Sequence, residues 1–388
     1  QIQVQNDYAG KFEVDGVSLS PVVGVAYQYG DTPTNIYLQD HSLPPANLAA
    51  GVYNPPVPSL GNFTTFISDT PSSGWLGQAY AYLTAGFLNN RLYVDVGGER
   101  TWANVNDYTD HGMELPGLDE FVGTHAPQTD ATLAHTGSVL LPSVPDSRDA
   151  YMLGVLGKIL PNLSAYGTVS TNASVASGTP IWQEGKEYEF GLKSQFLDNR
   201  LTITADHFQI SESNVSSTNP LYNTGQSLVP LLYQDLNNHG EEINIDGGLT
   251  SNLSVIISGT LMHLRDPEGR RQRNIPDNMA AALLNYRFTT GVLNRVNVFA
   301  GVVHQGNVAG ETVTGYTKLG VPELPGFYVP AFTVLNVGAG YRPSRKYEFN
   351  LNIDNALNEK FWWQASSRTS LAPYPGLNVR FTITVHPF

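Results

Sequence analysis

The amino-acid sequence predicts an all-β fold, an antiparallel transmembrane β-barrel, and three observations lead to this prediction. Apolar and polar residues alternate with a period of two over many segments, as in strands with one apolar and one polar face. Very short turns alternate with long connections along the whole chain. Charged residues make up 14% of the sequence, whereas roughly 25% is typical of soluble domains.

Seven pairs of alternating segments are each joined by a short turn, and the turns are rich in residues that tight hairpins require. In the pair within 332–355, aromatic and aliphatic residues from Tyr347 to Ile353 alternate with Glu and Asn. A final alternating segment, 378–388, stands alone, so we expect about 15 strands. The seven turns read VDGV, LNNR, LPNL, LDNR, LTSN, TTGVLN and RPSRK.

The other connections are long and rich in Pro, Gly, Ser, Asn and aromatic residues. So many long loops would count against a compact soluble domain. In outer-membrane barrels, however, short turns occupy one rim and long loops the other. The long connections cover 30–74, 105–150, 173–185, 212–238, 265–277, 305–331 and 357–376.

The two strand faces predict a barrel wall with lipid on one side and water on the other. Apolar side chains would face lipid and polar ones the lumen, and the sheet must close because unpaired backbone groups in hydrocarbon are costly. Phe208 and Ile210 break the parity set by Leu201 and Ile203. We therefore expect a bulge or the membrane boundary near Phe208.

Composition argues against several other classes of protein. The net charge of −13 is unlike the basic surface of a general nucleic-acid binder, and without cysteine there is no disulfide framework or thiolate metal site. No HExxH or Gly-x-Ser-x-Gly pattern indicates an enzyme, and we expect no resident cofactor or metal. The acidic residues within 117–121 could contact Ca²⁺, but a solvated loop explains them more simply.

Several blocks in the C-terminal half carry a family resemblance. GKEYEFGLKSQFLDNRLTITADHFQI (185–210) and HGEEINIDGGLTSNLSVIISGTLMH (239–263) are similar to paired barrel strands of TonB-dependent outer-membrane receptors of the ferric-siderophore type. FTVLNVGAGYRPSRKYEFNLNIDNALNEKFW (332–362) and PGLNVRFTITVHPF resemble the penultimate hairpin and the closing strand of that family. The matching motif positions are Glu189, Gly191, Lys193, Gly240 and Glu242. In the closing strand, where the family usually has Gly-x-x-Arg, Gly376 and Arg380 are one residue farther apart.

The resemblance implies a fold and a function for a longer protein. Barrels of this family have about 22 strands around a plug, so residues 1–388 would be a partial barrel domain that lacks the plug and upstream strands. The first residues also lack the pattern of a secretion signal, which predicts a processed or truncated N-terminus. The implied function is uptake of a ferric siderophore across the outer membrane of a Gram-negative bacterium, driven by the TonB energy-coupling system.

The resemblance also makes the end of the chain a candidate signal. A terminal aromatic residue such as Phe388 resembles the feature that the barrel-assembly machinery recognises, although Pro387 departs from the alternation just before it.

Candidate ligand-binding residues lie in the long connections. Arg270, Arg271 and Arg273 concentrate positive charge in an acidic protein, and guanidinium groups suit oxygen-rich anions such as ferric siderophores. Lipopolysaccharide phosphates or simple solvation are the alternatives for this cluster. Aromatic residues in the loops could form a ligand platform or an interfacial girdle; the candidates are Tyr316, Tyr328 and Trp363.

Three other functions compete with siderophore uptake. A passive porin of roughly 16 or 18 strands fits the length of the chain, but not the order of the blocks. A TonB-dependent receptor for a vitamin or a saccharide is the alternative for the cargo, which the sequence does not name. An outer-membrane barrel enzyme would need a catalytic constellation, and the sequence offers none.

Overall fold

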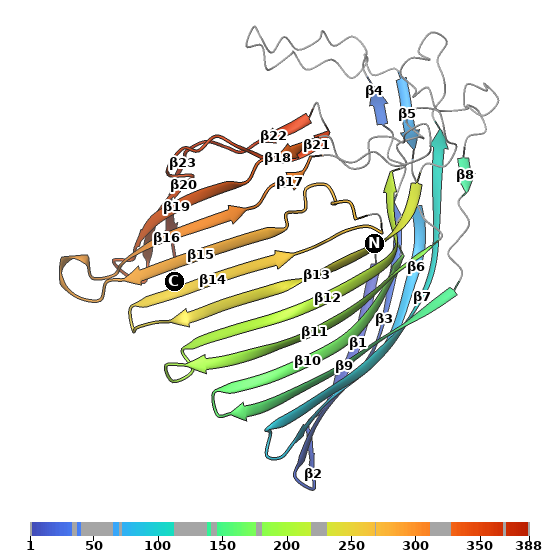
Figure 1. Ribbon diagram of the computed structural model, residues 1–388, viewed down its shortest axis with the longest axis horizontal. Coiled ribbons are helices and arrows are strands. Elements are labelled where there is room, and N and C mark those ends of the chain that lie inside the picture. Colours follow the sequence, from blue (N-terminus) through green and yellow to red (C-terminus); the bar gives the residue numbers. More distant parts are fainter. Residues whose placement is uncertain are drawn as a thin grey trace.

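The computed structural model is a single curved wall of antiparallel strands (Figure 1). This arrangement confirms the predicted fold class. Among the described residues, no helix is long and apolar enough to span a membrane. The structure describes residues 2–32, 37–39, 65–69, 72–111, 138–140, 146–175, 181–218, 231–267, 269–310, 327–367 and 370–386.

Sequential strands pair with one another across the wall, as hairpin connections require. The strands β1 and β2 both pair with β3 and form one interrupted strand, so the described wall has the 15 strands predicted. From edge to edge the wall contains β1 (Ile2–Ala9) with β2 (Phe12–Val14), β3 (Val17–Thr32), β6 (Ser72–Phe87), β7 (Leu92–His111), β9 (Asp146–Leu160), β10 (Leu163–Val175), β11 (Trp182–Phe196), β12 (Leu201–Thr218), β13 (Leu231–Gly248), β14 (Leu253–Met262), β15 (Asn278–Arg287), β16 (Val296–Gln305), β19 (Phe332–Tyr341), β20 (Tyr347–Asp354) and β23 (Asn378–Val385).

Short strands extend the end of the wall opposite the tight turns (Figure 1). Three of them continue the sheet beyond β7, and four form two separate pairs. The former are β4 (Tyr37–Gln39), β5 (Thr65–Asp69) and β8 (Ser138–Leu140); the latter are β17 (Val308–Ala309) with β18 (Tyr328–Val329), and β21 (Trp362–Ser367) with β22 (Ser370–Pro373).

All seven predicted short turns join neighbouring strands of the wall. Asp15 and Gly16 both have positive φ, 50° and 80°, which is the geometry that twists a two-residue turn in the same sense as its strands. Asn and Asp tolerate this backbone region better than other residues with a Cβ, which explains why they recur in the turns. The turn between β15 and β16 is longer and includes a single 3₁₀ turn, Gly291–Leu293.

The two faces of the wall differ as the alternation predicts. On β11, Tyr188, Phe190 and Leu192 are about half exposed on the outer face, while Glu189, between two of them, accepts a hydrogen bond from the Tyr166 hydroxyl at 2.5 Å. The rings of Tyr341, Phe349 and Phe381 stack across β19, β20 and β23 on the outer face. The outer, apolar face is therefore the lipid-facing face of the transmembrane wall.

Of the two explanations predicted for the change of parity near Phe208, the bulge is wrong, and the membrane boundary stays a prediction. The register with β11 is continuous from Phe196 opposite Leu201 to Glu184 opposite Ser213. Phe208 occupies an inward position against Gly240, where the missing side chain leaves space for its ring. The irregularity lies beyond Ile210, at Asn214, whose φ is 59°.

We predict that the two faces respond oppositely to added charge, and β10 provides a matched pair of positions. Val169 lies opposite Tyr188 on the outer face, and its neighbour Thr168 lies opposite Glu189 on the inner face. Val169→Arg should destabilise the full-length receptor in lipid vesicles by up to roughly 2–4 kcal/mol, because arginine on the lipid face costs about that much at the midplane and less toward the interfaces. Thr168→Arg should cost far less, as measured by urea unfolding; equal losses would contradict the assignment of the faces.

Candidate functional site

The candidate site is a mouth cluster at the loop end of the wall, formed by the described part of 263–277 with β17, β18, β21 and β22. The loop after β14 reaches across to β17 through two backbone bridges. One bridge is parallel, between Arg273 and Ala309, and the other is antiparallel, between Pro276 and Val308. Segments far apart in sequence are thereby joined in one unit.

A small apolar core and one amide side chain hold this unit together. Val308 and Ala365 are fully buried and Val329 is 2% exposed, with Phe327 packed against them. The Asn274 side chain donates to the Ala365 carbonyl and accepts from the Ala365 N–H, both at 2.9 Å. The Asn274 amide thereby pairs both backbone groups of the buried Ala365, which must find hydrogen-bond partners.

Arg265 forms a bidentate ion pair with Asp277, the residue before β15. Its Nη1 and Nη2 donate to the two carboxylate oxygens at 2.9 and 3.0 Å, the geometry that makes such pairs strong. Burial acts to raise the pKa of Asp277, but the hydrogen bonds and charge of Arg265, with the charges of Arg271 and His263, outweigh it. The pKa is therefore held below its ordinary value of 3.8.

Arg270 is engaged within its own loop. Its Nε lies 2.5 Å from Asp266 Oδ2, and its backbone N–H donates to Asp266 Oδ1 at 2.8 Å. The two side chains are 10% and 2% exposed. Because a buried carboxylate needs such partners, this predicted ligand residue shapes the loop.

Arg271 connects the loop to β17 and β18. Its two Nη atoms donate to the Asn307 side-chain and backbone oxygens at 2.9 and 2.6 Å. Its guanidinium carbon lies 5.5 Å from the ring centre of Tyr328, within the range of cation–π attraction. Two predicted ligand residues, Arg271 and Tyr328, are thus brought together.

Of the other predicted ligand residues, some are exposed at the mouth and one lies outside the described residues. Arg273 is exposed at the mouth, and its backbone makes the bridge to β17. Tyr328 and Trp363 are 48% and 45% exposed, and Trp363 belongs to β21, which Asn274 holds in place. Tyr316, Phe388 and the acidic residues within 117–121 lie outside the described residues.

Several residues that organise the mouth were not predicted. The arginine-rich segment also contains Asp266, Asn274 and Asp277. No sequence pattern indicated which groups these side chains would bond. Asn355 is fully buried, and its amide bonds the Glu359 backbone N–H and carbonyl at 2.9 Å. Asn355 lies in the block 332–362 that carried part of the resemblance and begins an Asn-x-x-x-x-x-Phe stretch there, so that block was the available signal. The Phe that ends the stretch, Phe361, stacks on Phe332 at 4.2 Å.

Two glycines among the motif residues of the resemblance, Gly191 and Gly240, have structural explanations in the wall. A side chain at Gly191 would meet the Ala205 carbonyl oxygen at 2.7 Å and the Tyr166 ring at 2.9 Å. At Gly240 it would collide with the Leu261 carbonyl of the next strand. Both glycines therefore permit close approach of neighbouring groups.

In the mouth cluster, some charged side chains are engaged by partners within the protein and other side chains are exposed. Ion pairs and hydrogen bonds engage Arg265, Arg270 and Arg271, while Arg273, Tyr328 and Trp363 are exposed nearby. Such a surface suits a ligand with oxygen anions and flat rings. Within the described residues, no group of three or more His, Cys, Asp or Glu side chains is placed to hold a metal.

We predict that Asn274→Ala loosens the mouth cluster without unfolding the wall. The substitution leaves both backbone groups of the buried Ala365 unpaired, which costs roughly 1–3 kcal/mol for each such group. Hydrogen exchange should show faster exchange at Ala365 and unchanged protection in β14. Asn274→Asp, which keeps an acceptor for the Ala365 N–H, should give an intermediate rate; equal rates in all three proteins would contradict the role of Asn274.

The lowered pKa of Asp277 predicts a pH dependence. Its stabilising contribution should be complete above pH 3.8 and lost as the pH falls through the lower folded-state pKa. The Arg265 N–H donates to the Asn237 carbonyl at 2.8 Å and reports on this region by hydrogen exchange. Asp277→Asn should speed its exchange at neutral pH, and the difference from wild type should shrink below pH 3.8. A difference that is constant with pH would contradict this assignment.

Comparison with curated proteins identifies relatives that are receptors. The metal-pseudopaline receptor CntO of Pseudomonas aeruginosa is 24% identical over 249 residues, covering 60% of this chain and 33% of that protein. The probable TonB-dependent siderophore receptor PiuA of Acinetobacter baumannii is 25% identical over 242 residues, covering 55% and 31% respectively. The matched part of the chain thus spans about a third of the length of these relatives.

Solved structures share the fold over nearly the whole chain. The closed form of the ferric-catecholate import receptor Fiu from E. coli K12 gives a TM-score of 0.74 at 17% identity, covering 99% of this chain and 54% of that one. The siderophore receptor PiuA from Acinetobacter baumannii gives a TM-score of 0.69 at 16% identity, covering 98% and 55%.

The family described as TonB dependent receptor-like, beta-barrel, matches residues 1–356. Together with the 15-stranded wall and its short-turn and long-loop ends, this match shows that the chain belongs to the TonB-dependent receptor β-barrel family.

Proposed function

We propose that this chain is part of the barrel of an outer-membrane receptor that takes up a ferric siderophore in a Gram-negative bacterium. The observation that carries the proposal is the family match over residues 1–356, combined with relatives that are named as siderophore receptors in both comparisons. The family is one of transport receptors, which agrees with a role in uptake.

Within this proposal, the mouth residues divide into two roles. Arg273, Tyr328 and Trp363 contact the ligand, because they are exposed at the loop end of the wall. Arg270 and Arg271 hold the loop that presents them, through Asp266 and Asn307. Tyr316 remains a proposed ligand contact on the basis of its place in the sequence.

The proposal includes partners beyond the cargo. The TonB system would supply energy through a plug inside the complete barrel, and residues 1–388 would be a partial barrel domain. The barrel-assembly machinery would recognise Phe388, and the outer face of the wall would contact lipid and lipopolysaccharide. No resident cofactor and no nucleic-acid partner are part of the proposal.

The test is ligand binding by the full-length receptor purified from outer membranes. Ferric catecholates and ferric hydroxamates should be titrated by tryptophan fluorescence, with vitamin B12 and a maltodextrin as alternative cargoes. We expect saturable binding of a ferric siderophore. Binding of the vitamin or the saccharide alone would assign another cargo, and an open ion-conducting pore without any ligand would favour a passive porin.

We predict that Arg273→Ala weakens siderophore binding roughly ten- to a hundredfold, because a hydrogen bond to a charged group contributes about 1.5–3 kcal/mol. The matched control is Arg345→Ala, which removes an exposed arginine from a short turn at the opposite rim. Affinity should be unchanged in the control. Equal affinity in both variants would remove Arg273 from the ligand site.

A further inference from the structure

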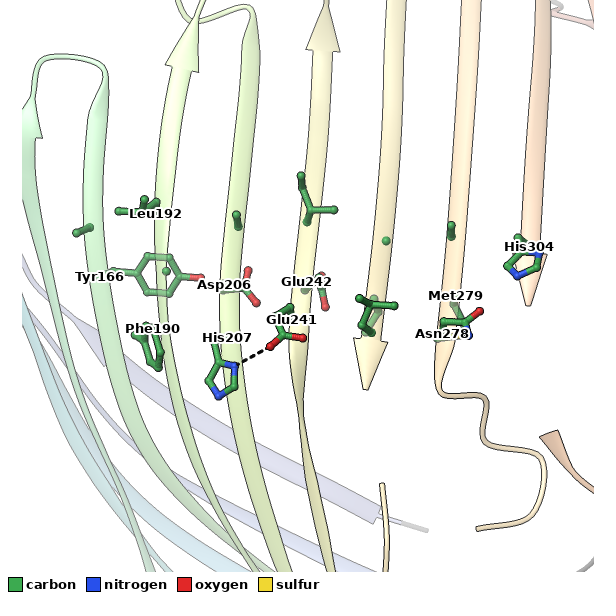
Figure 2. Close-up of a pocket in the computed structure, with 18 residues that line it drawn as sticks. Tyr166, Phe190, Leu192, Asp206, His207, Glu241, Glu242, Asn278, Met279 and His304 are labelled. Carbon is green, nitrogen blue, oxygen red and sulfur yellow. Dashed lines mark hydrogen bonds and ion pairs between the residues drawn. The ribbon is translucent and has the colours of Figure 1, made fainter. Parts of the chain in front are cut away.

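All four histidines in the described part of 207–304 lie on the outer face of the wall, and they differ in whether their rings have partners. The ring of His207 is 3.4 Å from a carboxylate oxygen of Glu241 (Figure 2). The ring of His304 is hydrogen-bonded to a threonine hydroxyl at 2.9 Å. His239 and His263 are exposed, and no described residue is hydrogen-bonded to either of their rings. The nitrogens of these two rings are therefore available to a ligand.

His239 and His263 lie directly opposite each other on neighbouring strands. The register of β13 with β14 continues through this pair, and the His263 N–H donates to the His239 carbonyl at 2.8 Å. The ring centres are 5.4 Å apart, with 40° between the ring planes. Beyond the pair, Asn237 and Arg265 exchange two backbone hydrogen bonds of 2.8 Å. Backbone bonding on this side of the pair thus holds the two strands together at a fixed spacing.

The separation of the two rings fits two ligands of one metal ion. An imidazole nitrogen binds zinc at about 2.0–2.1 Å, which places the ring centre about 3.2 Å from the ion. Two such centres 5.4 Å apart enclose an angle of about 115° at the ion, close to the tetrahedral angle. The alternative is a contact between aromatic rings alone, since their spacing also suits that.

The pair lies where water can reach it. Glu241 is exposed on the same outer face, two residues farther from the mouth along β13. A charged side chain on this face is costly at the membrane midplane and costs little near the interface, so Glu241 lies near the boundary with water. His239 lies about 7 Å farther toward the mouth, on the aqueous side of that carboxylate.

The chemistry of the two side chains selects the ion. Imidazole suits Cu²⁺, Ni²⁺ and Zn²⁺, whereas Ca²⁺ and Mg²⁺ take oxygen ligands. No third His, Cys, Asp or Glu side chain among the described residues is placed to complete the site. Water would fill the other coordination positions, so the ion would exchange with solvent.

We propose that His239 and His263 chelate a divalent transition-metal ion, with Cu²⁺ bound most tightly. His263 is the first residue of the segment 263–277 in the mouth cluster, and His239 belongs to β13. The ion therefore links the start of that segment to the wall, beside the backbone bonds of Arg265. The proposal rests on these two strands and is independent of the cargo of the receptor.

The test is titration of Cu²⁺ into the full-length receptor, purified in detergent without a histidine tag. Wild type should bind one more Cu²⁺ ion than His239→Ala or His263→Ala, and the affinity for that ion should fall at least tenfold in each variant. The double variant should bind no more weakly than either single variant, because one histidine alone does not chelate. Electron paramagnetic resonance of this ion should show two nitrogen ligands.

Matched controls are His207→Ala and His304→Ala, which remove outer-face histidines that have partners within the protein. Both should bind Cu²⁺ as wild type does. Equal binding in all variants would leave the pair as an aromatic contact and overturn the proposal, and so would equal losses in the controls.

A second measurement tests the link between the strands. Saturating Zn²⁺ should slow hydrogen exchange at the Arg265 N–H at least threefold in wild type and leave it unchanged in His263→Ala. Unchanged exchange in wild type would overturn the link. Protection of β14 without metal should be equal in all variants, which checks that each is folded.

Discussion

The structure depends on one constraint, which is that backbone N–H and C=O groups in hydrocarbon must find partners within the protein. Continuous antiparallel ladders meet this constraint across the wall, from β3 to β20. The ladder imposes alternation of side chains, so each strand presents one face to lipid and the other to the lumen. A single layer of strands also explains why the described core is small and consists of scattered buried residues.

At the mouth the strand ladders end, and side chains provide the hydrogen-bond partners that buried backbone groups need. Asn274 bonds both backbone groups of Ala365, and Asn355 does the same for the loop that follows β20. Buried ion pairs such as Arg270 with Asp266 satisfy charges that the loops enclose. A ligand surface on loops needs such supports, because exposed residues bind well only if their backbone is held in position.

The strands and short turns of the wall could be predicted from the sequence because the patterns that indicate them are local. Strand alternation and turn chemistry act between neighbours, so the 15 strands and seven turns could be predicted. Phe208 misled the prediction because its inward ring depends on a glycine of the next strand, Gly240. The arginine cluster was visible as charge, but its partners were not. Arg271 binds Asn307 from a distant segment, and no local pattern reports such a pairing.

The pairing register of a strand determines which of its residues face lipid and which face the lumen. On β13, Glu241 and His239 face lipid while Glu242 lies on the inner face, so a slip of one residue would exchange all three. Gly240 restricts that slip, because its position lies too close to the Leu261 carbonyl of β14 for any side chain. A residue with a Cβ brought to this position would separate β13 from β14. The glycine of the family motif therefore maintains the distinction between the lipid-facing residues of β13 and its luminal residues.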